Sequence, residues 1–419
     1  MNRNYFIVGL IMFVFFVISF LTNIMGPLVP AIIEDFDLSL TLVAILPFAF
    51  FVAYGVFSIP SGVLVERYGE QKVMVWAFFM SFIGALSLAL FPNYLMAILS
   101  LFFIGTGMAM LQVAINPLLR TAGGEEHFAF NSVMAQMLFG LASFLSPLAY
   151  TYLVTNLDDK AGASNFLLDS LARVVPENLS WVSMYWLFAL ISLIMVVLIK
   201  FSKLPRVELK EDERVGKWST IVGLIKRPVI ILYFLGIFFY VGSEQGVNNW
   251  VSEFLQTYHG ADPLTVGATV ISRFWGLMTL GTLLGLLLLK LIDSRYVLIG
   301  FSAAAIVSLT VALFGGLDAA VIAFPLVGFF ASVMWSILIS LSLNSVAEHH
   351  GTIAGVLVTG IVGGAVWPLI IGSIGDVFGL KTGMLLLYIS LGYILSVGFW
   401  ARPLVTNKTV NWNKNNEDK

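Results

Sequence analysis

Residues 201–227, FSKLPRVELKEDERVGKWSTIVGLIKR, form the longest charged interval in an otherwise apolar chain. Apolar runs of about 20 residues, long enough to cross a bilayer as helices, lie on both sides of it. Six runs precede the interval and six follow it, at roughly residues 6–33, 41–64, 73–91, 94–119, 128–155, 180–200, 229–257, 264–289, 296–314, 319–346, 352–375 and 382–401. We therefore expect an all-α membrane protein with twelve transmembrane helices in two six-helix bundles. The expected domains are an N-terminal bundle, a cytoplasmic linker, a C-terminal bundle and a cytoplasmic tail, at residues 1–200, 201–227, 228–402 and 403–419.

The composition supports this class and excludes several others. Hydrophobic residues make up 59% of the chain and charged residues 11%, whereas soluble domains carry about 25% charged residues. The net charge of −2 gives no indication of a nucleic-acid partner. Because the chain has no cysteine, disulfides, thiol catalysis and cysteine-ligated metals are excluded. The sequence shows no phosphate-binding loop, metal-ligand cluster or nucleophile elbow, so we expect no enzyme, no cofactor and no metal site.

The distribution of Lys and Arg predicts the orientation in the membrane. If the N-terminus is cytoplasmic, the segments on that side hold nearly all of the 22 Lys and Arg residues. The opposite side holds Lys160, Arg173 and Lys381, and Arg273 lies within a span. Positive residues concentrate in cytoplasmic loops, so both termini are expected to be cytoplasmic. The first apolar run is too long for a cleaved signal peptide and is expected to be retained.

A charged motif follows the second apolar run. Residues 62–72, GVLVERYGEQK, resemble the cytoplasmic loop motif of the major facilitator superfamily, with Glu66 in place of the usual aspartate. An acid at a helix end can pair with a cation or with a neighbouring helix N-terminus in one conformation only, which suits a gate. The alternative is a basic loop with a turn glycine. The expected gate residues are Gly62, Glu66, Arg67, Gly69 and Lys72. The matching place in the second half, residues 285–295, is degenerate.

Amide and tryptophan side chains recur inside the apolar runs. Gln112 and Asn116 are four residues apart and share a helix face. Residues 238–250, FFYVGSEQGVNNW, add four polar side chains to one span. Amides donate and accept hydrogen bonds, and an aromatic ring can cover the apolar face of a pyranose, so the set suits a neutral polyhydroxylated ligand. The alternative is that polar groups join helix to helix. The candidate binding residues are Gln112, Asn116, Gln136, Gln245, Asn248, Asn249, Trp250, Trp335 and Trp367.

Two charged residues fall within the predicted spans. Glu244 lies about 21 Å along its helix from the cytoplasmic side, and Arg273 lies toward the outer end of the next span. Both are therefore expected in the outer half of the bilayer, where the two could pair. A paired carboxylate stays charged, whereas an unpaired buried carboxylate can carry a proton. We therefore consider two roles for Glu244 and Arg273, a static ion pair and a site of ion coupling.

Three motifs resemble one branch of the major facilitator superfamily. LQVAINP at residues 111–117, FFYVGSE at residues 238–244 and GIVGGAV at residues 360–366 are similar to the fucose/galactose/glucose:proton symporter family, and the similarity covers nearly the whole chain. The resemblance implies a twelve-helix alternating-access transporter for a monosaccharide, driven by a cation gradient. Carried over by position, Gln112, Asn116, Gln136 and Glu244 match polar positions of that family.

The chain also departs from the family pattern. The family's span-1 Asn-Asp falls on Met25 and Gly26, so the aspartate associated with proton coupling is absent. Its span-5 and span-10 asparagines fall on Phe139 and Ala331, and its span-8 Gly-Arg falls on residues 281–282, Gly-Thr. Glu244 then becomes the remaining candidate for coupling.

These observations favour a monomeric symporter of a monosaccharide, a hexose such as glucose, in a bacterial inner membrane. Its partners would be the neutral sugar, a proton or sodium ion, and the lipid bilayer. One alternative is an exporter of amphipathic compounds, a drug/proton antiporter. It is favoured by the 14% aromatic content and by the missing span-1 acid, and opposed by the amides in the spans. A second alternative is a non-transporting receptor or scaffold, which the gate motif opposes.

Overall fold

The computed structural model describes residues 5–124, 128–158, 165–205, 223–224, 226–346 and 350–404. These residues contain helices and no strand, and twelve helical segments are long and apolar enough to cross a membrane. The all-α prediction is confirmed, and each of the twelve segments overlaps one predicted span. The predicted linker at residues 201–227 and the tail at residues 403–419 lie largely outside the described residues.

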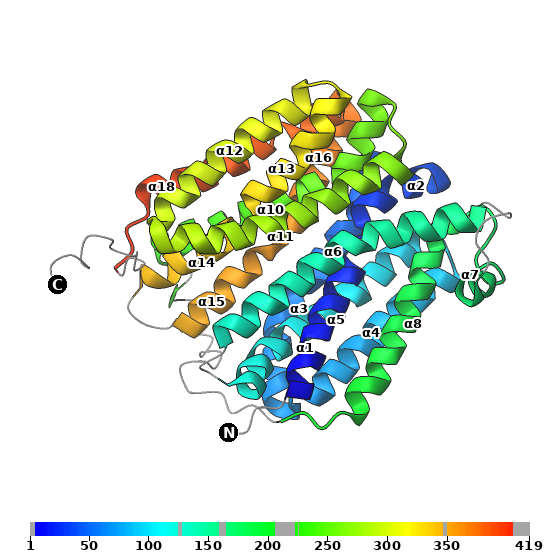
Figure 1. Cartoon of the computed structure of the whole chain (residues 1–419), viewed down its shortest axis with the longest axis horizontal. Coiled ribbons are helices and arrows are strands. Elements are labelled where there is room, and N and C mark those ends of the chain that lie inside the picture. The colour runs from blue at the N-terminus through cyan, green and yellow to red at the C-terminus, as the bar shows by residue number, and fades with distance from the viewer. Residues whose placement is uncertain are drawn as a thin grey trace, which may run out of the picture.

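The first six spans form the N-terminal bundle, toward the lower right of Figure 1. They are α1 (Tyr5–Thr22) with α2 (Met25–Phe36), α3 (Leu40–Tyr68), α4 (Glu70–Leu90), α5 (Tyr94–Gly123), α6 (Phe128–Asp158), and η2 (Ser180–Val182) with α8 (Ser183–Phe201). The short helix α7 (Phe166–Leu171) lies between the last two spans.

The other six spans form the C-terminal bundle, toward the upper left of Figure 1. They are α10 (Pro228–His259), η4 (Pro263–Gly267) with α11 (Ala268–Leu291), α12 (Ser294–Phe314), α13 (Leu317–Ala331) with α14 (Met334–Asn344), α15 (His350–Val358) with η5 (Thr359–Val362) and α16 (Gly363–Phe378), and α17 (Leu380–Met384) with α18 (Leu387–Trp400).

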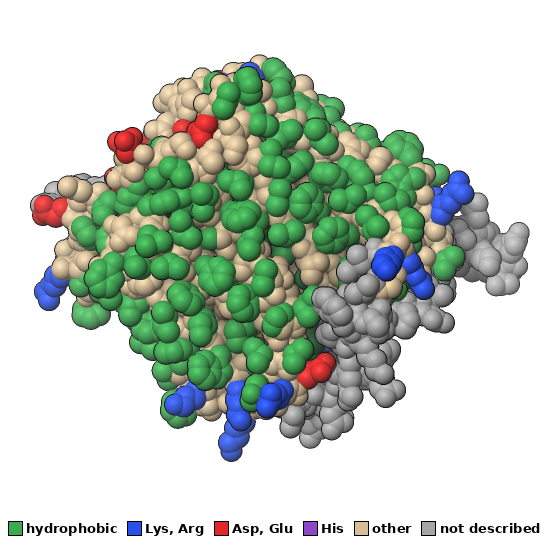
Figure 2. All heavy atoms as spheres, turned by 180° about the vertical axis from the view of Figure 1, so that it is seen from behind, with side chains coloured by type: hydrophobic (Ala, Val, Ile, Leu, Met, Phe, Trp, Pro, Cys, Tyr) green, Lys and Arg blue, Asp and Glu red, His purple; other side chains and the backbone are tan. Residues whose placement is uncertain are grey.

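The surface is that of a protein surrounded by lipid. Figure 2 shows apolar side chains over the middle of the molecule and charged side chains nearer its edges. Large apolar residues such as Trp76, Leu287 and Ile322 are more than half exposed. An apolar surface of this extent would be unfavourable in water, whereas hydrocarbon chains cover it at no such cost.

Span 1 is broken between α1 and α2, just before Pro27. Pro27 has no backbone N–H, and its ring collides with the carbonyl four residues earlier, that of Asn23. The helix accordingly stops at Thr22 and restarts at Met25. The Asn23 amide lies in this break and donates to the hydroxyls of Ser19 and Ser143. These bonds tie α1 to α6 and keep the break inside the N-terminal bundle.

Glycines bring the two bundles into contact. A Cβ on Gly26 of α2 would collide with the backbone carbonyl of Asn248 on α10, and a Cβ on Gly140 of α6 would collide with Thr279 on α11. Gly372 of α16 lies in the same way against the carbonyl of Leu40 at the start of α3. Small residues at helix interfaces let backbones approach closely. Three pairs of helices therefore close the bundles against each other.

The contacts that join the bundles favour one end of the molecule. We call the end where α3 ends and α4 begins the terminal side, because α1 begins and α18 ends there, and the other end the distal side. At the distal side, the hydroxyl of Thr151 on α6 donates to the carbonyl of Leu264 in η4. About two helical turns further toward the middle of α6, the hydroxyl of Ser272 on α11 donates to the carbonyl of Phe144. The bundles are thus joined at the distal side.

Candidate functional site

Five side chains of α10 and α11 form a continuous polar chain inside the C-terminal bundle. The hydroxyl of Tyr240 donates to Glu244 Oε2 at 2.7 Å, and Gln245 Nε2 donates to Glu244 Oε1 at 3.0 Å. Asn248 Nδ2 donates to Gln245 Oε1 at 3.5 Å, and the indole N–H of Trp275 donates to Asn248 Oδ1 at 2.9 Å. Helical spacing explains the bonds of Tyr240 to Glu244 and of Asn248 to Gln245, since residues three or four apart lie on one face. The chain links a carboxylate to two of the predicted amides.

The carboxylate at the end of this chain has apolar surroundings. A cavity of about 10 Å³ adjoins Tyr240, Ser243 and Glu244. Its other walls are apolar side chains of α10, α11, α13, α14 and α18: Val247, Phe274, Val327, Ala331, Met334, Leu387 and Leu391. This volume is close to the smallest that holds one water molecule. Glu244 is therefore held by hydrogen bonds, which are stronger to a charged acceptor than to a neutral one.

The predicted ion pair between Glu244 and Arg273 is wrong in this structure. Arg273 is exposed, and no ion pair joins it to Glu244. The reason is helical geometry, because successive residues point about 100° apart. Phe274 faces the cavity beside Glu244, and Trp275 faces Asn248. Arg273, the residue before them, is directed outward.

Two of the three predicted tryptophans belong to the interior. Trp250 is 1% exposed, and its N–H donates to the carbonyl of Pro368. Trp367 packs against the rings of Phe238 and Phe239, and its N–H donates to the hydroxyl of Ser390. Their assignment to sugar stacking is corrected, because both rings hold α10 and α18 against α16. Trp335 is only partly buried, beside the ring of Tyr240.

Asn249 is the buried amide without a partner. It is 2% exposed, and neither its oxygen nor its nitrogen has a hydrogen-bond partner among the described residues. An unsatisfied buried amide costs about 1–3 kcal/mol. Its predicted role in binding stays a prediction.

The predicted amides of the N-terminal bundle are accessible. Gln112 is partly exposed on α5, and Asn116 on α5 and Gln136 on α6 are exposed. Asn116 Nδ2 donates to the backbone carbonyl of Gln112 at 3.3 Å, a bond that leaves its oxygen available. A polar amide facing lipid would be unfavourable, so these side chains favour a water-accessible space. No described hydrogen bond joins these three amides to the polar chain on α10 and α11.

Tyr240 and Trp275 belong to the polar chain but were not among the predicted residues. Tyr240 lies four residues before Glu244, so helical spacing alone could have indicated it. Trp275 is 27 residues after Asn248 and lies on another helix. No sequence spacing indicates such a contact, because it depends on how α10 and α11 pack.

The predicted gate motif lies in the turn from α3 to α4 at the terminal side. Gly69 has a φ of +84° there, a conformation that favours glycine. Glu66, Arg67 and Lys72 are exposed, and the Arg67 guanidinium lies 5.2 Å from the centre of the Tyr68 ring. Among the described residues Glu66 forms no ion pair. No described ion pair of Glu66 therefore joins the bundles in this conformation.

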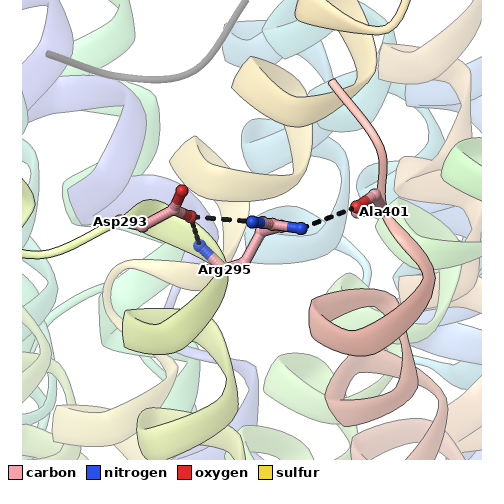
Figure 3. Close-up of polar contacts among 3 residues, drawn as sticks. All are labelled: Asp293, Arg295 and Ala401. Atoms are coloured by element: carbon pink, nitrogen blue, oxygen red, sulfur yellow. Dashed lines mark hydrogen bonds and ion pairs between the residues drawn. The ribbon is translucent and has the colours of Figure 1, made fainter. Parts of the chain in front are cut away.

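The degenerate motif of the second half is tied into its own bundle (Figure 3). Asp293 accepts from the backbone N–H of Arg295 at 2.8 Å and pairs with its guanidinium at 3.3 Å. Arg295 also donates to the carbonyl of Ala401, at the end of α18, at 3.4 Å. These contacts fix the start of α12 to the end of α18.

A carboxylate on α16 closes the distal side by capping a helix of the other bundle. Asp376 accepts from the backbone N–H groups of Leu40 and Thr41 at 2.8 and 2.9 Å, and from the Thr41 hydroxyl at 2.5 Å. The first N–H groups of a helix have no partner within it and carry partial positive charge. The start of α3 is thus satisfied by the C-terminal bundle. We call this contact the distal clasp.

Asp376→Asn should weaken the distal clasp and let the distal side open more readily. An amide supplies one acceptor oxygen where the carboxylate supplies two, and loss of a helix cap costs about 1 kcal/mol. The chain lacks cysteine, so spin labels can be introduced through Leu95→Cys and Ile322→Cys, at exposed positions in α5 and α13. Pulsed spin-resonance distances should shift toward longer values. Asp318→Asn, in the first turn of α13, is the control, and equal distance distributions in both variants would remove the clasp from gating.

Comparison with known proteins places this architecture. The family profile of the Major Facilitator Superfamily matches residues 11–368. This chain belongs to that superfamily. Its members are transporters, which confirms the prediction of a transporter and not an enzyme. The chain is 28% identical to the glucose/galactose transporter of Brucella abortus over 409 residues, covering 95% of this chain and 94% of that protein.

Two further similarities have lower identity. The L-fucose-proton symporter of Escherichia coli is 22% identical over 400 residues, covering 90% of this chain and 89% of that protein. A bacterial homologue of the human lysosomal transporter Spinster, solved in an inward-facing and unoccupied conformation, superposes with a TM-score of 0.77 at 15% identity, covering 95% of this chain and 96% of that one. This structural likeness confirms the fold of two six-helix bundles.

Proposed function

We propose that this superfamily member is a symporter that couples proton uptake to the uptake of a neutral monosaccharide, a hexose such as glucose. The observation that carries the proposal is the direct bonding of Glu244 to Gln245, and through it to Asn248. A carboxylate without a cationic partner can bind a proton, and amides can bind sugar hydroxyls. Relatives named as a glucose/galactose transporter and an L-fucose-proton symporter support the same function.

The sugar would bind between the bundles. The N-terminal bundle would supply Gln112, Asn116 and Gln136, which are accessible side chains. The C-terminal bundle would supply its amides, with Trp335 as the aromatic surface, since it is partly exposed. The amides of this set are Gln245, Asn248 and Asn249. A ligand held by both bundles is released when they rock apart, as alternating access requires.

The coupling would rest on Glu244 alone. By the resemblance to the symporter family, Gly26 stands at the position of its span-1 aspartate, and in this conformation there is no room for such a side chain. A side chain on Gly26 would collide with the Asn248 carbonyl. Arg273 has no part in this proposal, since it is exposed and does not contact Glu244. The proton and not sodium is proposed because Glu244 is surrounded by hydrogen-bond donors and apolar walls, whereas Na⁺ needs several oxygen ligands.

The orientation follows from the charge distribution. With both termini cytoplasmic in a bacterial inner membrane, the distal side faces outward. The bundles are joined there by the distal clasp and the Thr151 and Ser272 bonds, so this conformation would be closed to the outside. The gate motif at residues 62–72 would join the bundles in the opposite conformation.

The test is sugar uptake into proteoliposomes containing the purified protein. An inward proton gradient should drive accumulation of labelled glucose or galactose above the external concentration, and an imposed sodium gradient should not. A one-unit pH gradient supplies about 1.4 kcal/mol per proton, enough for about tenfold accumulation. Uptake of each hexose that only equilibrates under a proton gradient would contradict the proposal. Proton-driven expulsion of an amphipathic dye would instead support the exporter.

A further inference from the structure

Trp275 fixes the direction of the three bonds that lead from it to Glu244. An indole N–H donates and cannot accept, so the Asn248 atom facing it is the oxygen. The other Asn248 atom, the nitrogen, must then donate to Gln245 Oε1. Gln245 in turn must present its nitrogen to Glu244. The observed distances follow this order, at 2.9, 3.5 and 3.0 Å.

The far end of the chain reinforces this direction. Tyr240 donates its hydroxyl proton to the second oxygen of Glu244 at 2.7 Å. Both carboxylate oxygens therefore accept, which suits the charged form of Glu244. Because charge-assisted hydrogen bonds are stronger than neutral ones, the charged carboxylate holds the Gln245 amide toward itself.

Proton uptake changes one side of this arrangement more easily than the other. A hydroxyl turns about its C–O bond, so Tyr240 can accept from a protonated Glu244. Gln245 cannot become an acceptor at that position while Asn248 and Trp275 fix the orientation of its amide. Its bond to the neutral carboxyl is then weaker. The bond on its other side is the longest of the chain, at 3.5 Å, so the bond from Asn248 holds Gln245 only weakly.

We propose that Trp275 is a positioning residue for coupling, whose N–H fixes Asn248 so that proton binding to Glu244 releases Gln245 toward the sugar. This inference rests on the proposed function. It names the Gln245 amide as the group through which proton binding and sugar binding favour each other. Such coupling is reciprocal. The proton comes from water and remains on the carboxyl group, and no other bond forms or breaks in the protein.

The other groups around Glu244 do not compete for this role. The residues that α11, α13, α14 and α18 place at the cavity are apolar, and Tyr240 is the other titratable side chain among the residues lining it. No ion pair joins Glu244 to a described residue. Of the described elements packed against α10, α11 is the one whose side chain bonds to the Asn248 amide.

The test compares the pH dependence of sugar binding in matched variants. Trp275→Phe keeps an aromatic ring and removes the N–H. Acidification should increase the sugar affinity of the wild type. In Trp275→Phe this increase should be about threefold to tenfold smaller, the range expected for one hydrogen bond. Trp275→His, which keeps a ring N–H, should restore part of the increase. Trp186→Phe is the control, because its buried N–H has no partner among the described residues and lies in the N-terminal bundle.

The outcomes separate the two proposals. If the wild type shows no proton-driven accumulation, the proposed function fails. If the wild type accumulates sugar and Trp275→Phe keeps the wild-type pH dependence, the role of Trp275 fails and the symporter stands. Asn248→Asp provides a second variant, since its ionised carboxylate still accepts from Trp275 but cannot donate to Gln245. Trp275→Phe should retain sugar exchange without a gradient, and an Asn248→Asp protein with wild-type pH dependence would also overturn the inference.

Discussion

Glu244→Gln is expected to abolish proton-driven accumulation while sugar exchange continues. Glutamine has the same shape and keeps an oxygen acceptor, so the polar chain with Tyr240 and Gln245 can persist in rearranged form. Glutamine does not titrate, however, and no other acid or base lines the adjacent cavity except Tyr240. A transporter that binds sugar without binding a proton equilibrates its substrate and cannot concentrate it.

The measurement is labelled sugar in proteoliposomes under an inward pH gradient of one unit. The wild type should reach about tenfold accumulation if one proton moves per sugar, as follows from about 1.4 kcal/mol per unit. The variant should reach the external concentration only. In counterflow, with sugar on both sides and no pH gradient, the two proteins should exchange label at similar rates.

A matched control lies on the same helix. Glu253 is nine residues further along α10, is partly buried, and accepts from the hydroxyl of Thr257 at 2.8 Å. It makes no described contact with the polar chain, so Glu253→Gln should accumulate sugar like the wild type. Undiminished accumulation by the Glu244→Gln protein would assign Glu244 to structure and remove it from coupling.

The second large effect is expected at Gly26, where α2 touches the backbone of α10. An alanine Cβ would overlap the carbonyl oxygen of Asn248 and would lie 2.9 Å from Ile271 Cδ1. A backbone carbonyl cannot turn aside as a flexible side chain can. The two helices must therefore separate, and overpacking of this kind costs about 1–3 kcal/mol.

This cost applies to the conformation in which the distal side is closed. Gly26→Ala should shift the equilibrium toward distal opening by about fivefold to a hundredfold, and sugar transport should slow accordingly. The label pair at Leu95 and Ile322, described above for the distal clasp, should report the longer distance directly. Gly26→Asp, which restores the family's acid, should open the distal side further because its side chain is larger.

Gly9→Ala is the control for this substitution. Gly9 lies on α1, in the same span, and no atom lies within 4 Å of the position its Cβ would take. It should leave the label distances and the transport rate unchanged. If Gly26→Ala gives distances equal to those of Gly9→Ala, close approach of α2 and α10 does not control distal closure.

The sequence determined the class of the protein and its plan. Lipid forces each span to satisfy its own backbone as a helix about 20 residues long, so the apolar runs fixed the number of spans and the charged interval at residues 201–227 divided them. Three local motifs indicated one branch of the major facilitator superfamily, and the family profile then showed that superfamily. Helical spacing also placed Glu244, Gln245 and Asn248 close together on one helix.

What surrounds those side chains was decided by the tertiary structure. Whether Arg273 meets Glu244, whether Trp250 faces a sugar or Pro368, and which group holds Asn248 depend on how neighbouring helices rotate about their axes. Within a span nearly every face is apolar, so the sequence carries little signal about that rotation. It is set by packing between helices, such as Gly26 against the Asn248 carbonyl. The sequence therefore supplied the polar groups of α10, and the packing of α2, α11 and α16 decided their partners.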